Sequence, residues 1–432
     1  MTGRHERGRS RWLGMRAGTA LTRDFRLHVA QTSTAPLGIV VAAARGAWIT
    51  DAGGRRYLDL LSGMGVVNLG HGNRAVARAC RAQLRRHLHV MVYGEYVVPM
   101  QVELATRLAA LAGPPYESCY FTNSGAEAIE GALKTARKHT GRSKLVGFAL
   151  GFHGDTLGAL SIGGNPVYRD PFLPLLPGAT ILPWQEPAAL RAIDRRTAAV
   201  VIEPVQAEGG VRIADPAYLR LLRARCDEVG ALLVFDEVVT GMGRTGSLFA
   251  FQRCGIRPDL LVLAKALGGG LPLGAFLGSR RILGTLAEQP ALAHVTTFGG
   301  HPLSCAAGLA ALEETVRRDL PGRAATRGAL FLRGLQDLAA RHPVIRAVRG
   351  TGLLLAVELA SPAATRRFAA ACLARGLIVN WTLHRDTVIR LAPPLVISRA
   401  EITFALGVME AALGELRRRH RRRRRADRAG RS

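Results

Sequence analysis

Short apolar runs alternate with amphipathic segments between residues 117 and 270. Five of the runs are almost continuously apolar, which is typical of strands buried on both faces of a parallel sheet. These runs cover residues 118–122, 144–149, 198–204, 231–237 and 259–265. Helices are expected between them over 124–140 and 216–229, because a glycine follows each segment and Asp215-Pro216 opens the second. The pattern predicts an α/β domain with a parallel sheet.

The C-terminal third of the chain has a different pattern. Residues 302–341 are expected to form two helical stretches around Pro321-Gly322. Apolar strands follow at 350–359 and 376–383, and a final amphipathic helix is expected over 399–416. These elements predict a second, smaller α+β part.

The N-terminal region adds a small β-structure. Residues 38–70 indicate a hairpin with its turn at Gly53-Gly54, and this hairpin is expected to pack with the C-terminal part. The predicted division is a basic, disordered or extended segment 1–30, an N-terminal part 31–75, a large domain 76–306, a small domain 307–416 and an Arg-rich disordered tail 417–432.

Composition places the chain among globular proteins. Its 432 residues are 48% hydrophobic, which is enough for a large core. No apolar stretch reaches the roughly 18 residues of a membrane span, and no secretory signal follows the basic start. The six cysteines lie far apart without a C-x-x-C pair, so neither a zinc site nor a disulfide framework is expected. A cytoplasmic location with reduced cysteines is therefore predicted.

The formal charge of +27 is concentrated at the ends of the chain. Residues 417–432 contain ten Arg and one Asp, and residues 1–16 contain five Arg and one Glu. Runs of like charge repel one another, so solvated extensions are the first interpretation. The alternative is an arm that binds polyanions such as nucleic acid.

Polar residues lie at the carboxyl ends of four of the predicted strands, at Asn123, Glu203, Asp236 and Lys265. Ligands bind beyond the carboxyl ends of such strands. The lysine is notable because only four of the 59 basic residues are lysine. Unlike arginine, a buried lysine can lose its proton and attack a carbonyl group. Lys265 is therefore a candidate nucleophile.

Two further features accompany this lysine. Ser124 can cap the helix that follows it, and Gly125 allows the backbone to approach a ligand, so the helix start is either a phosphate site or an ordinary cap. Asp236 could ligate a metal, act as a base or pair with a protonated ring nitrogen, and no nearby His/Asp cluster favours a metal. Together, an amine, a carboxylate and a phosphate cradle match the needs of pyridoxal 5'-phosphate (PLP).

The sequence resembles the class III aminotransferases of the fold-type I PLP enzymes from about Leu37 to Gly414. Seven motifs occur in that family's order: NSGAEA at 123–128, GFHGDTLGALS at 151–161, EPVQAEGG at 203–210, DEVVTGMGRTG at 236–246, LAKALGGGLPLGA at 263–275, TTFGGHPLSCAA at 296–307 and RLAPPL at 390–395. The resemblance implies a mainly parallel seven-stranded sheet in the large domain. It also implies a homodimer with shared active sites.

The resemblance assigns a role to individual residues. Lys265 would form the Schiff base with PLP and transfer protons, and Asp236 would pair with the pyridinium nitrogen. Phe152 would stack on the ring, and His153 would serve either structure or catalysis. Thr297 would reach the phosphate from the neighbouring subunit. The implied cofactor-binding set is Ser124, Gly125, Ala126, Phe152, His153, Glu203, Asp236, Val239, Lys265 and Thr297.

Substrate positions follow from the same resemblance. Arg390 would bind a substrate carboxylate, and Glu208 would mask this arginine when the substrate has no carboxylate there. Val239 replaces a glutamine of ornithine-type members, Asp155 replaces a basic residue, and Met64 replaces a tyrosine. These differences disfavour a second substrate carboxylate and favour a more apolar pocket.

The resulting prediction is a ping-pong aminotransferase. A diamine or ω-amino acid would donate nitrogen to the cofactor, and a keto acid, expected to be 2-oxoglutarate, would accept it. The alternatives are an α-amino acid transaminase, or a racemase, mutase or decarboxylase on the same fold. A distant alternative is a polyanion-binding protein that acts through the Arg-rich tail.

Overall fold

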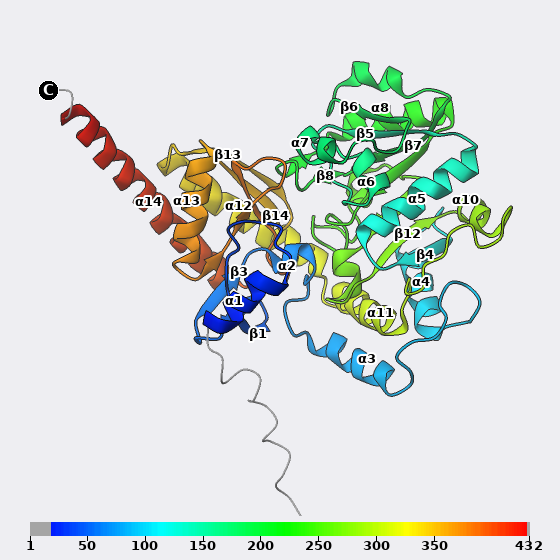
Figure 1. The fold of residues 1–432 in the computed structure, drawn as a ribbon, viewed down its shortest axis with the longest axis horizontal. Helices are drawn as coiled ribbons and strands as arrows, with labels where there is room; N and C mark the ends of the chain where they lie inside the picture. Colours follow the sequence, from blue (N-terminus) through cyan, green and yellow to red (C-terminus); the bar gives the residue numbers. More distant parts are fainter. Residues whose placement is uncertain (1–18, 430–432) are drawn as a thin grey trace, which may run out of the picture.

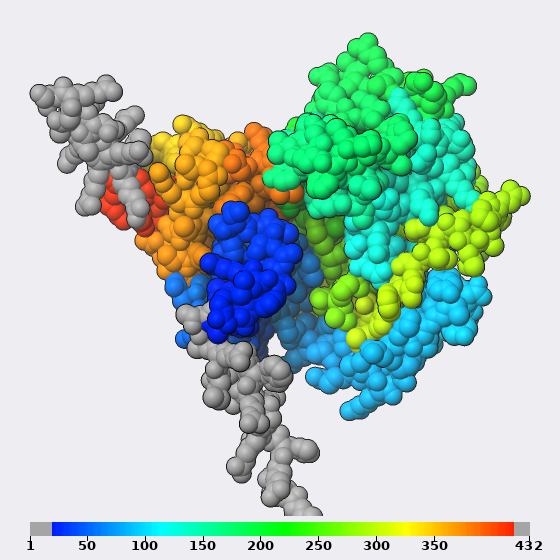
Figure 2. All heavy atoms as spheres, in the orientation of Figure 1, coloured from blue at the N-terminus to red at the C-terminus, as the bar shows by residue number. Residues whose placement is uncertain are grey.

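The protein consists of a large α/β domain beside a smaller α+β domain (Figure 1). The computed structural model describes residues 19–429, and it describes side chains from residue 20 to residue 418. Both ends of the described chain belong to the small domain. In the space-filling view, the blue N-terminal residues lie against the orange C-terminal ones (Figure 2). No described helix combines the length and apolar character needed to cross a bilayer.

A seven-stranded sheet forms the centre of the large domain, in the order β4-β12-β11-β10-β7-β5-β6. Only β12 runs antiparallel to its neighbours, so the expected mainly parallel sheet is confirmed. The strands are β4 (Ser118–Thr122), β5 (Lys144–Phe148), β6 (Ala179–Leu182), β7 (Thr197–Ile202), β10 (Leu232–Asp236), β11 (Leu260–Leu263) and β12 (Gly274–Gly278). The apolar pattern predicted five of these strands. It missed β6 and β12, and β12 begins and ends with a glycine.

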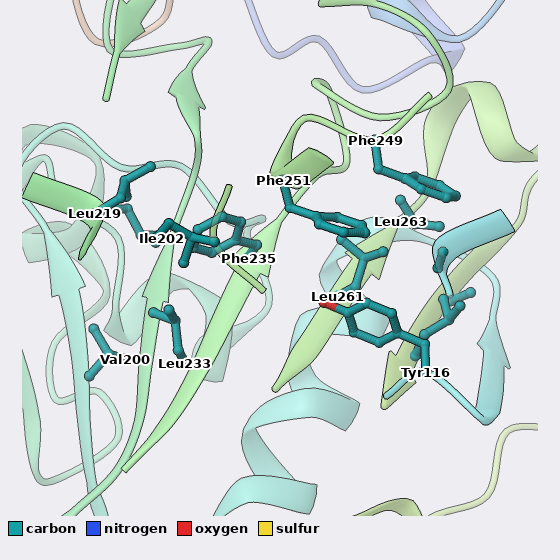
Figure 3. Close-up of a cluster of buried hydrophobic side chains, with 14 of the residues drawn as sticks. Tyr116, Val200, Ile202, Leu219, Leu233, Phe235, Phe249, Phe251, Leu261 and Leu263 are labelled. Carbon is teal, nitrogen blue, oxygen red and sulfur yellow. The ribbon is translucent and has the colours of Figure 1, made fainter. Parts of the chain in front are cut away.

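Both faces of this sheet are buried. Along β10, Leu233 and Phe235 point into one apolar cluster, and Leu232 and Val234 point into another. Figure 3 shows the first cluster, in which Leu219 of a covering helix lies beside Ile202 of β7, and Leu261 of β11 lies near Phe251. Burial of one such side chain contributes about 1.5–3 kcal/mol, which explains why these strands are apolar throughout.

Helices cover the two faces of the sheet, and α5 begins at its carboxyl edge, directly after β4. The expected helices are confirmed as α5 and α8, each of which ends at a glycine in the left-handed region. The helices of this part are α3 (Arg74–Leu84), α4 (Pro99–Ala112), α5 (Gly125–Thr140), α6 (Leu157–Ser161), α7 (Pro166–Arg169), α8 (Pro216–Val229), α9 (Phe251–Cys254), α10 (Arg280–Leu283) and α11 (Pro302–Arg317). The expected domain boundary at 306/307 falls within α11.

The small domain contains two four-stranded sheets. One has the order β13-β14-β17-β16, and the other has the order β1-β2-β3-β15. The pairing of β3 with β15 joins the N-terminal hairpin to the C-terminal part, as predicted. The strands are β1 (Val41–Arg45), β2 (Trp48–Asp51), β3 (Arg56–Asp59), β13 (Ile345–Thr351), β14 (Leu354–Leu359), β15 (Leu377–Ile378), β16 (Asn380–Trp381) and β17 (Val388–Leu391).

The helices of this domain are α1 (Thr19–His28), α2 (Ser62–Gly65), α12 (Leu320–Arg341), α13 (Pro362–Leu373) and α14 (Arg399–Ala429). The helix break was predicted at Pro321-Gly322, but α11 ends at Arg317 and Pro321 lies in the first turn of α12. Proline needs no intrahelical N–H partner in a first turn, so it opens this helix rather than ending it.

Both terminal segments contain more helix than the charge pattern predicted. Residues 19–28 of the expected disordered or extended segment form α1. Helix α14 continues through residues 417–429 of the expected disordered tail, and Figure 1 shows its C-terminal end projecting from the domain. Arginine has a high helix propensity, and extending an existing helix requires no new nucleation. Residues 1–18 and 430–432 lie outside the described residues.

Candidate active site

A cavity of about 100 Å³ lies at the carboxyl edge of the central sheet. Its walls come from the segments that follow β5, β7, β10 and β11, together with the first turn of α5. It brings together most of the residues predicted for the site. The lining residues are Ala126, Phe152, His153, Gly154, Glu203, Ala207, Glu208, Asp236, Val238, Val239 and Lys265.

Lys265 occupies a tight turn directly after β11. Its own φ is +49°, and the short 3₁₀ turn η3 (Lys265–Gly268) begins with it. The backbone therefore turns sharply where the strand ends, and the side chain enters the cavity. Burial, followed by the positive charge of Arg390, lowers the pKa of Lys265. A lower pKa increases the fraction of neutral amine, which is the nucleophilic form.

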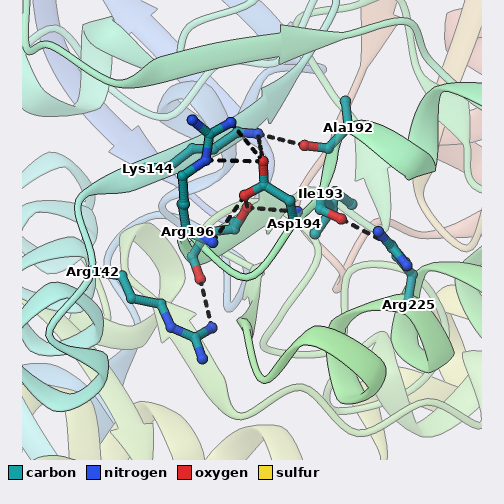
Figure 4. A network of polar contacts seen from close by, with 8 residues as sticks. Arg142, Lys144, Ala192, Ile193, Asp194, Arg196 and Arg225 are labelled. Carbon is teal, nitrogen blue, oxygen red and sulfur yellow. Dashed lines mark hydrogen bonds and ion pairs between the residues drawn. The ribbon is translucent and has the colours of Figure 1, made fainter.

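The other three lysines have structural partners. Lys134 Nζ donates to the carbonyl of Ala293 at 3.3 Å, and Lys138 Nζ donates to the carbonyl of Glu288. Lys144 Nζ lies 3.0 Å from Asp194 Oδ2 in a network at the edge of the sheet (Figure 4). Of the four lysines, only Lys265 lines the cavity.

Asp236 and His153 form a buried pair on one side of the cavity. His153 Nδ1 and Asp236 Oδ2 are 2.7 Å apart, and Asp236 Oδ1 accepts a hydrogen bond from the amide of Val238 at 3.0 Å. Burial disfavours the imidazolium, but the hydrogen bond and negative charge of Asp236 raise the pKa of His153 above its ordinary value. The imidazole therefore holds the Asp236 carboxylate in place at the cavity wall.

Glu203 fixes the loop that carries Phe152. Its Oε1 accepts from the amide of Phe152 and its Oε2 accepts from the amide of Ala207, both at 3.1 Å. Burial raises the pKa of Glu203, because the low dielectric disfavours its charge beside Asp236. These contacts give the residue a positioning role at the cavity wall.

The start of α5 provides a cradle for a phosphate group. Ser124 Oγ caps the helix by accepting from the amide of Glu127 at 3.1 Å, whereas the amides of Gly125 and Ala126 belong to the first turn and have no intrahelical partner. A Cβ on Gly154, where φ is +119°, would lie 2.5 Å from the Cβ of Ala126. A side chain at position 154 would therefore collide with Ala126, and the cradle is bordered there by glycine backbone. The residues present fit PLP: the start of α5 would hold its phosphate, Asp236 would pair with its ring nitrogen and Lys265 would bind its aldehyde.

Arg390 and Glu208 form an ion pair beside the cavity. Arg390 lies on β17 of the small domain and is only 4% exposed. Its Nη1 donates to Glu208 Oε1, and Glu208 Oε2 also accepts from the amide of Leu383 at 2.8 Å. Burial alone would raise the pKa of Glu208, but the charge of Arg390, the hydrogen bonds from Leu383 and Arg390 and the charge of Lys265 together lower it. Met64 Sδ lies 3.7 Å from Arg390 Nη2.

Six of the predicted residues are not part of the cavity lining: Ser124, Gly125, Met64, Asp155, Thr297 and Arg390. Thr297 is exposed, in the segment between α10 and α11, and Asp155 is exposed on the loop after Gly154. Phe152 is half-buried, and its ring meets the ring of His384 edge to face at a centroid distance of 5.8 Å. His384 was not identified from the sequence, because it belongs to no recognisable motif and reaches the site only through the packing of the two domains.

Comparisons with known proteins agree with this geometry. The family described as Aminotransferase class-III matches residues 29–413. The chain is 42% identical to an acetylornithine aminotransferase of Methanosarcina mazei, over 87% of this chain and 91% of that protein. It is also 42% identical to a putrescine aminotransferase of Pectobacterium atrosepticum, over 85% of this chain and 81% of that protein.

Solved structures that resemble this chain are also transaminases. An amine transaminase from an uncultivated Pseudomonas species, solved with PLP bound, is 34% identical with a TM-score of 0.83, covering 90% of this chain and 98% of that chain. An ornithine aminotransferase from Toxoplasma gondii is 30% identical with a TM-score of 0.87, covering 94% and 97%. The chain therefore belongs to the class III aminotransferases, which are PLP-dependent enzymes that move an amino group from an amino donor to a keto acid.

Proposed function

We propose that this enzyme takes the terminal amino group of a diamine or ω-amino acid and delivers it to 2-oxoglutarate. The observation that carries this proposal is the ion pair between Arg390 and Glu208, one partner of which lines the cavity that contains Lys265. A substrate carboxylate can replace Glu208 on the guanidinium, whereas an uncharged or amine-bearing group can leave the pair closed. One site then accepts both kinds of substrate in turn.

The residues of the chain have distinct tasks in this reaction. PLP, when bound, supplies an electron-withdrawing ring that stabilises negative charge at the substrate carbon. The neutral amine of Lys265 carries a proton to and from that carbon, which requires the lowered pKa that burial gives it. Asp236, supported by His153, holds a proton on the ring nitrogen. Glu203 keeps Phe152 and its loop in place through the amide contact.

The pocket residues support an ω-amino donor. Val239 is apolar and lines the cavity, and the thioether of Met64 lies against Arg390. Asp155 offers no positive charge for a second carboxylate. The names of the two relatives, acetylornithine and putrescine aminotransferase, also describe donors with an amino group at the end of an aliphatic chain. A donor of this kind fits the walls better than a dicarboxylic amino acid does.

We also propose that the enzyme is a homodimer that shares its active sites. Several large apolar side chains are exposed in the segments around α4 and before α11, which is unusual for a free surface. These residues are Leu84, Leu88, Tyr96, Val97, Val102, Leu292, Val295 and Phe298. Thr297 lies within the same surface, so a partner placed there would receive this residue at its own site. A cytoplasmic location belongs to the same proposal, supported by six free cysteines.

Half-reaction spectroscopy tests the substrate proposal. Holoenzyme is mixed with putrescine, ornithine, 4-aminobutyrate or an α-amino acid, and the loss of the cofactor's visible band is recorded. We expect the ω-amino donors to convert the cofactor fastest, and 2-oxoglutarate to restore the band with release of glutamate. Fast conversion by α-amino acids alone would contradict the ω-amino assignment.

A further inference from the structure

Three arginines converge on the hairpin that carries Glu208. Arg212 lies on β9 (Arg212–Ile213), which pairs with β8 (Val205–Gln206) in the large domain. Arg349 lies on β13, and Arg385 lies in the turn before β17. A Cβ on Gly210 would lie 3.0 Å from Arg385 Cδ and 3.2 Å from Arg349 Nη2. The glycine thus leaves room for both side chains at the junction of the two domains.

The positive charge of this arginine cluster is only partly balanced. Glu358 Oε2 pairs with Arg349 at 2.7 Å, and its Oε1 lies 3.6 Å from Arg385. Arg212 has no carboxylate partner among the described residues; its Nη1 reaches Gln206 Oε1 at 3.4 Å, and its guanidinium lies over the ring of Trp184. Three guanidinium groups and one carboxylate leave a net charge of +2.

Two observations indicate that the cluster lacks an acceptor. Arg349 Nη2 is buried and has no hydrogen-bond partner among the described residues. Burial, followed by the charges of Arg385 and Arg349, lowers the pKa of Arg212 to about 10, as expected for a guanidinium held beside other cations. Buried donors without a partner are costly, and a bound anion would satisfy them.

We propose that the cluster of Arg212, Arg349 and Arg385 binds a phosphate dianion, either free phosphate or the phosphate of a monoester. Guanidinium groups bind tetrahedral oxyanions through paired N–H donors, and a dianion matches the net charge of the cluster. The site is separate from the cradle at the start of α5, because it is built from the β8-β9 hairpin and the small domain.

The proposed phosphate site lies next to the backbone segments that hold Glu208 in place. Arg349 Nε donates to the carbonyl of Gly210 at 2.9 Å, two residues after Glu208. The amides of Leu383 and His384, just before Arg385, donate to the side chain and the carbonyl of Glu208. Phosphate in the cluster would fix both strands in the arrangement that keeps Glu208 on Arg390. It would thereby oppose the binding of a carboxylate acceptor, a consequence that rests on the proposed function.

Calorimetry tests the site without relying on the reaction. PLP-saturated holoenzyme is titrated at constant ionic strength with inorganic phosphate and, separately, with glycerol 3-phosphate. We expect one saturable site per chain, weakened at least tenfold by Arg385→Gln and by Arg212→Gln. Arg346→Gln is the matched control. Arg346 is exposed on the same strand as Arg349, and its substitution removes the same charge. Binding of inorganic phosphate alone would identify the free ion, and binding of both would identify the phosphate group.

Two results would overturn the assignment of the site. One is the absence of saturable binding to the wild-type holoenzyme, and the other is an equal loss of affinity in Arg346→Gln, which would indicate general charge attraction. For the coupling to Glu208, phosphate should raise the KM for 2-oxoglutarate at least threefold in the wild type and in Arg346→Gln, but not in Arg385→Gln. Equal inhibition of Arg385→Gln would instead indicate direct competition at Arg390 and would refute the coupling.

Discussion

The substitution Glu208→Gln separates the two tasks that we assign to the Arg390–Glu208 pair. Glutamine has nearly the same shape as glutamate, and its carbonyl oxygen can still accept from the amide of Leu383, which now binds Glu208 Oε2 at 2.8 Å. The negative charge opposite Arg390 is lost. Arg390, which is only 4% exposed, is then a buried cation without a counterion.

The expected loss of folding stability follows from the burial of Arg390. Removing one partner of a buried ion pair typically costs about 3–5 kcal/mol of folding stability. The retained contact to Leu383 places the expected loss near the lower end of that range. A carboxylate acceptor no longer has to displace Glu208, and a hydrogen bond to a charged group is worth about 1.5–3 kcal/mol. At about 1.4 kcal/mol per factor of ten, the KM for 2-oxoglutarate should fall by about one to two orders of magnitude.

Steady-state kinetics and urea unfolding measure these effects. We expect a lower KM for 2-oxoglutarate and a higher KM for putrescine, because the unmasked guanidinium repels a cationic donor. Succinate should restore more stability to Glu208→Gln than to the wild type, since its carboxylate replaces the missing charge. Glu228→Gln removes an exposed partner of Arg225 and is the control for loss of a surface charge.

The contribution of Glu208 to folding stability depends on pH in a defined direction. The pKa of Glu208 in the folded protein lies below its ordinary value of 4.5, so its contribution to stability is complete above that value and is lost as the pH falls through the folded pKa. The stability difference between wild type and Glu208→Gln should therefore be constant near neutral pH and shrink below about pH 4.5. An unchanged KM for 2-oxoglutarate together with unchanged stability at pH 7 would refute the masking role.

Three other substitutions test the framework of the site. Gly154→Ala would place a Cβ 2.5 Å from Ala126 at φ +119°, and we expect at least about tenfold weaker PLP binding in titrations of apoenzyme. Arg244→Met removes a fully buried guanidinium that donates four hydrogen bonds across the domain junction, and urea denaturation should show a loss of about 3 kcal/mol; an unchanged midpoint would contradict this. His153→Phe breaks the 2.7 Å contact to Asp236 and should weaken PLP binding by about 10–100-fold, whereas equal affinity would make the imidazole dispensable.

The central sheet could be predicted because its strands are buried on both faces. Phe235 and Val234 both lie in apolar clusters, so their strand is apolar without interruption and stands out from its surroundings. Strand β12 lacks this signal, since two of its five residues are glycine. At Gly274 a side chain would collide with the carbonyl of Ser124, so close packing against the start of α5 determines that residue.

The site residues also divide into those that the sequence predicts and those that it does not. Lys265 and Asp236 lie at the carboxyl ends of predicted strands, and the edge of a parallel sheet brings such positions together. The pairing of Glu208 with Arg390 was expected, but its backbone partners could not be foreseen. Leu383 and His384 reach Glu208 across the domain junction through backbone amides, which carry no residue-specific signal. The helical continuation of α14 differs from the expected disorder, because the high helix propensity of arginine outweighs the repulsion between like charges where a helix already exists.

The reactivity of Lys265 is the most direct test of the account. Purified protein is saturated with PLP, reduced with borohydride and digested, and the modified peptide is identified by mass spectrometry. We predict one cofactor adduct per chain, on Lys265, and neither adduct nor visible absorbance in Lys265→Ala. An adduct on another lysine, or a wild-type protein that stays colourless with PLP, would contradict the assignment of this cavity as the active site.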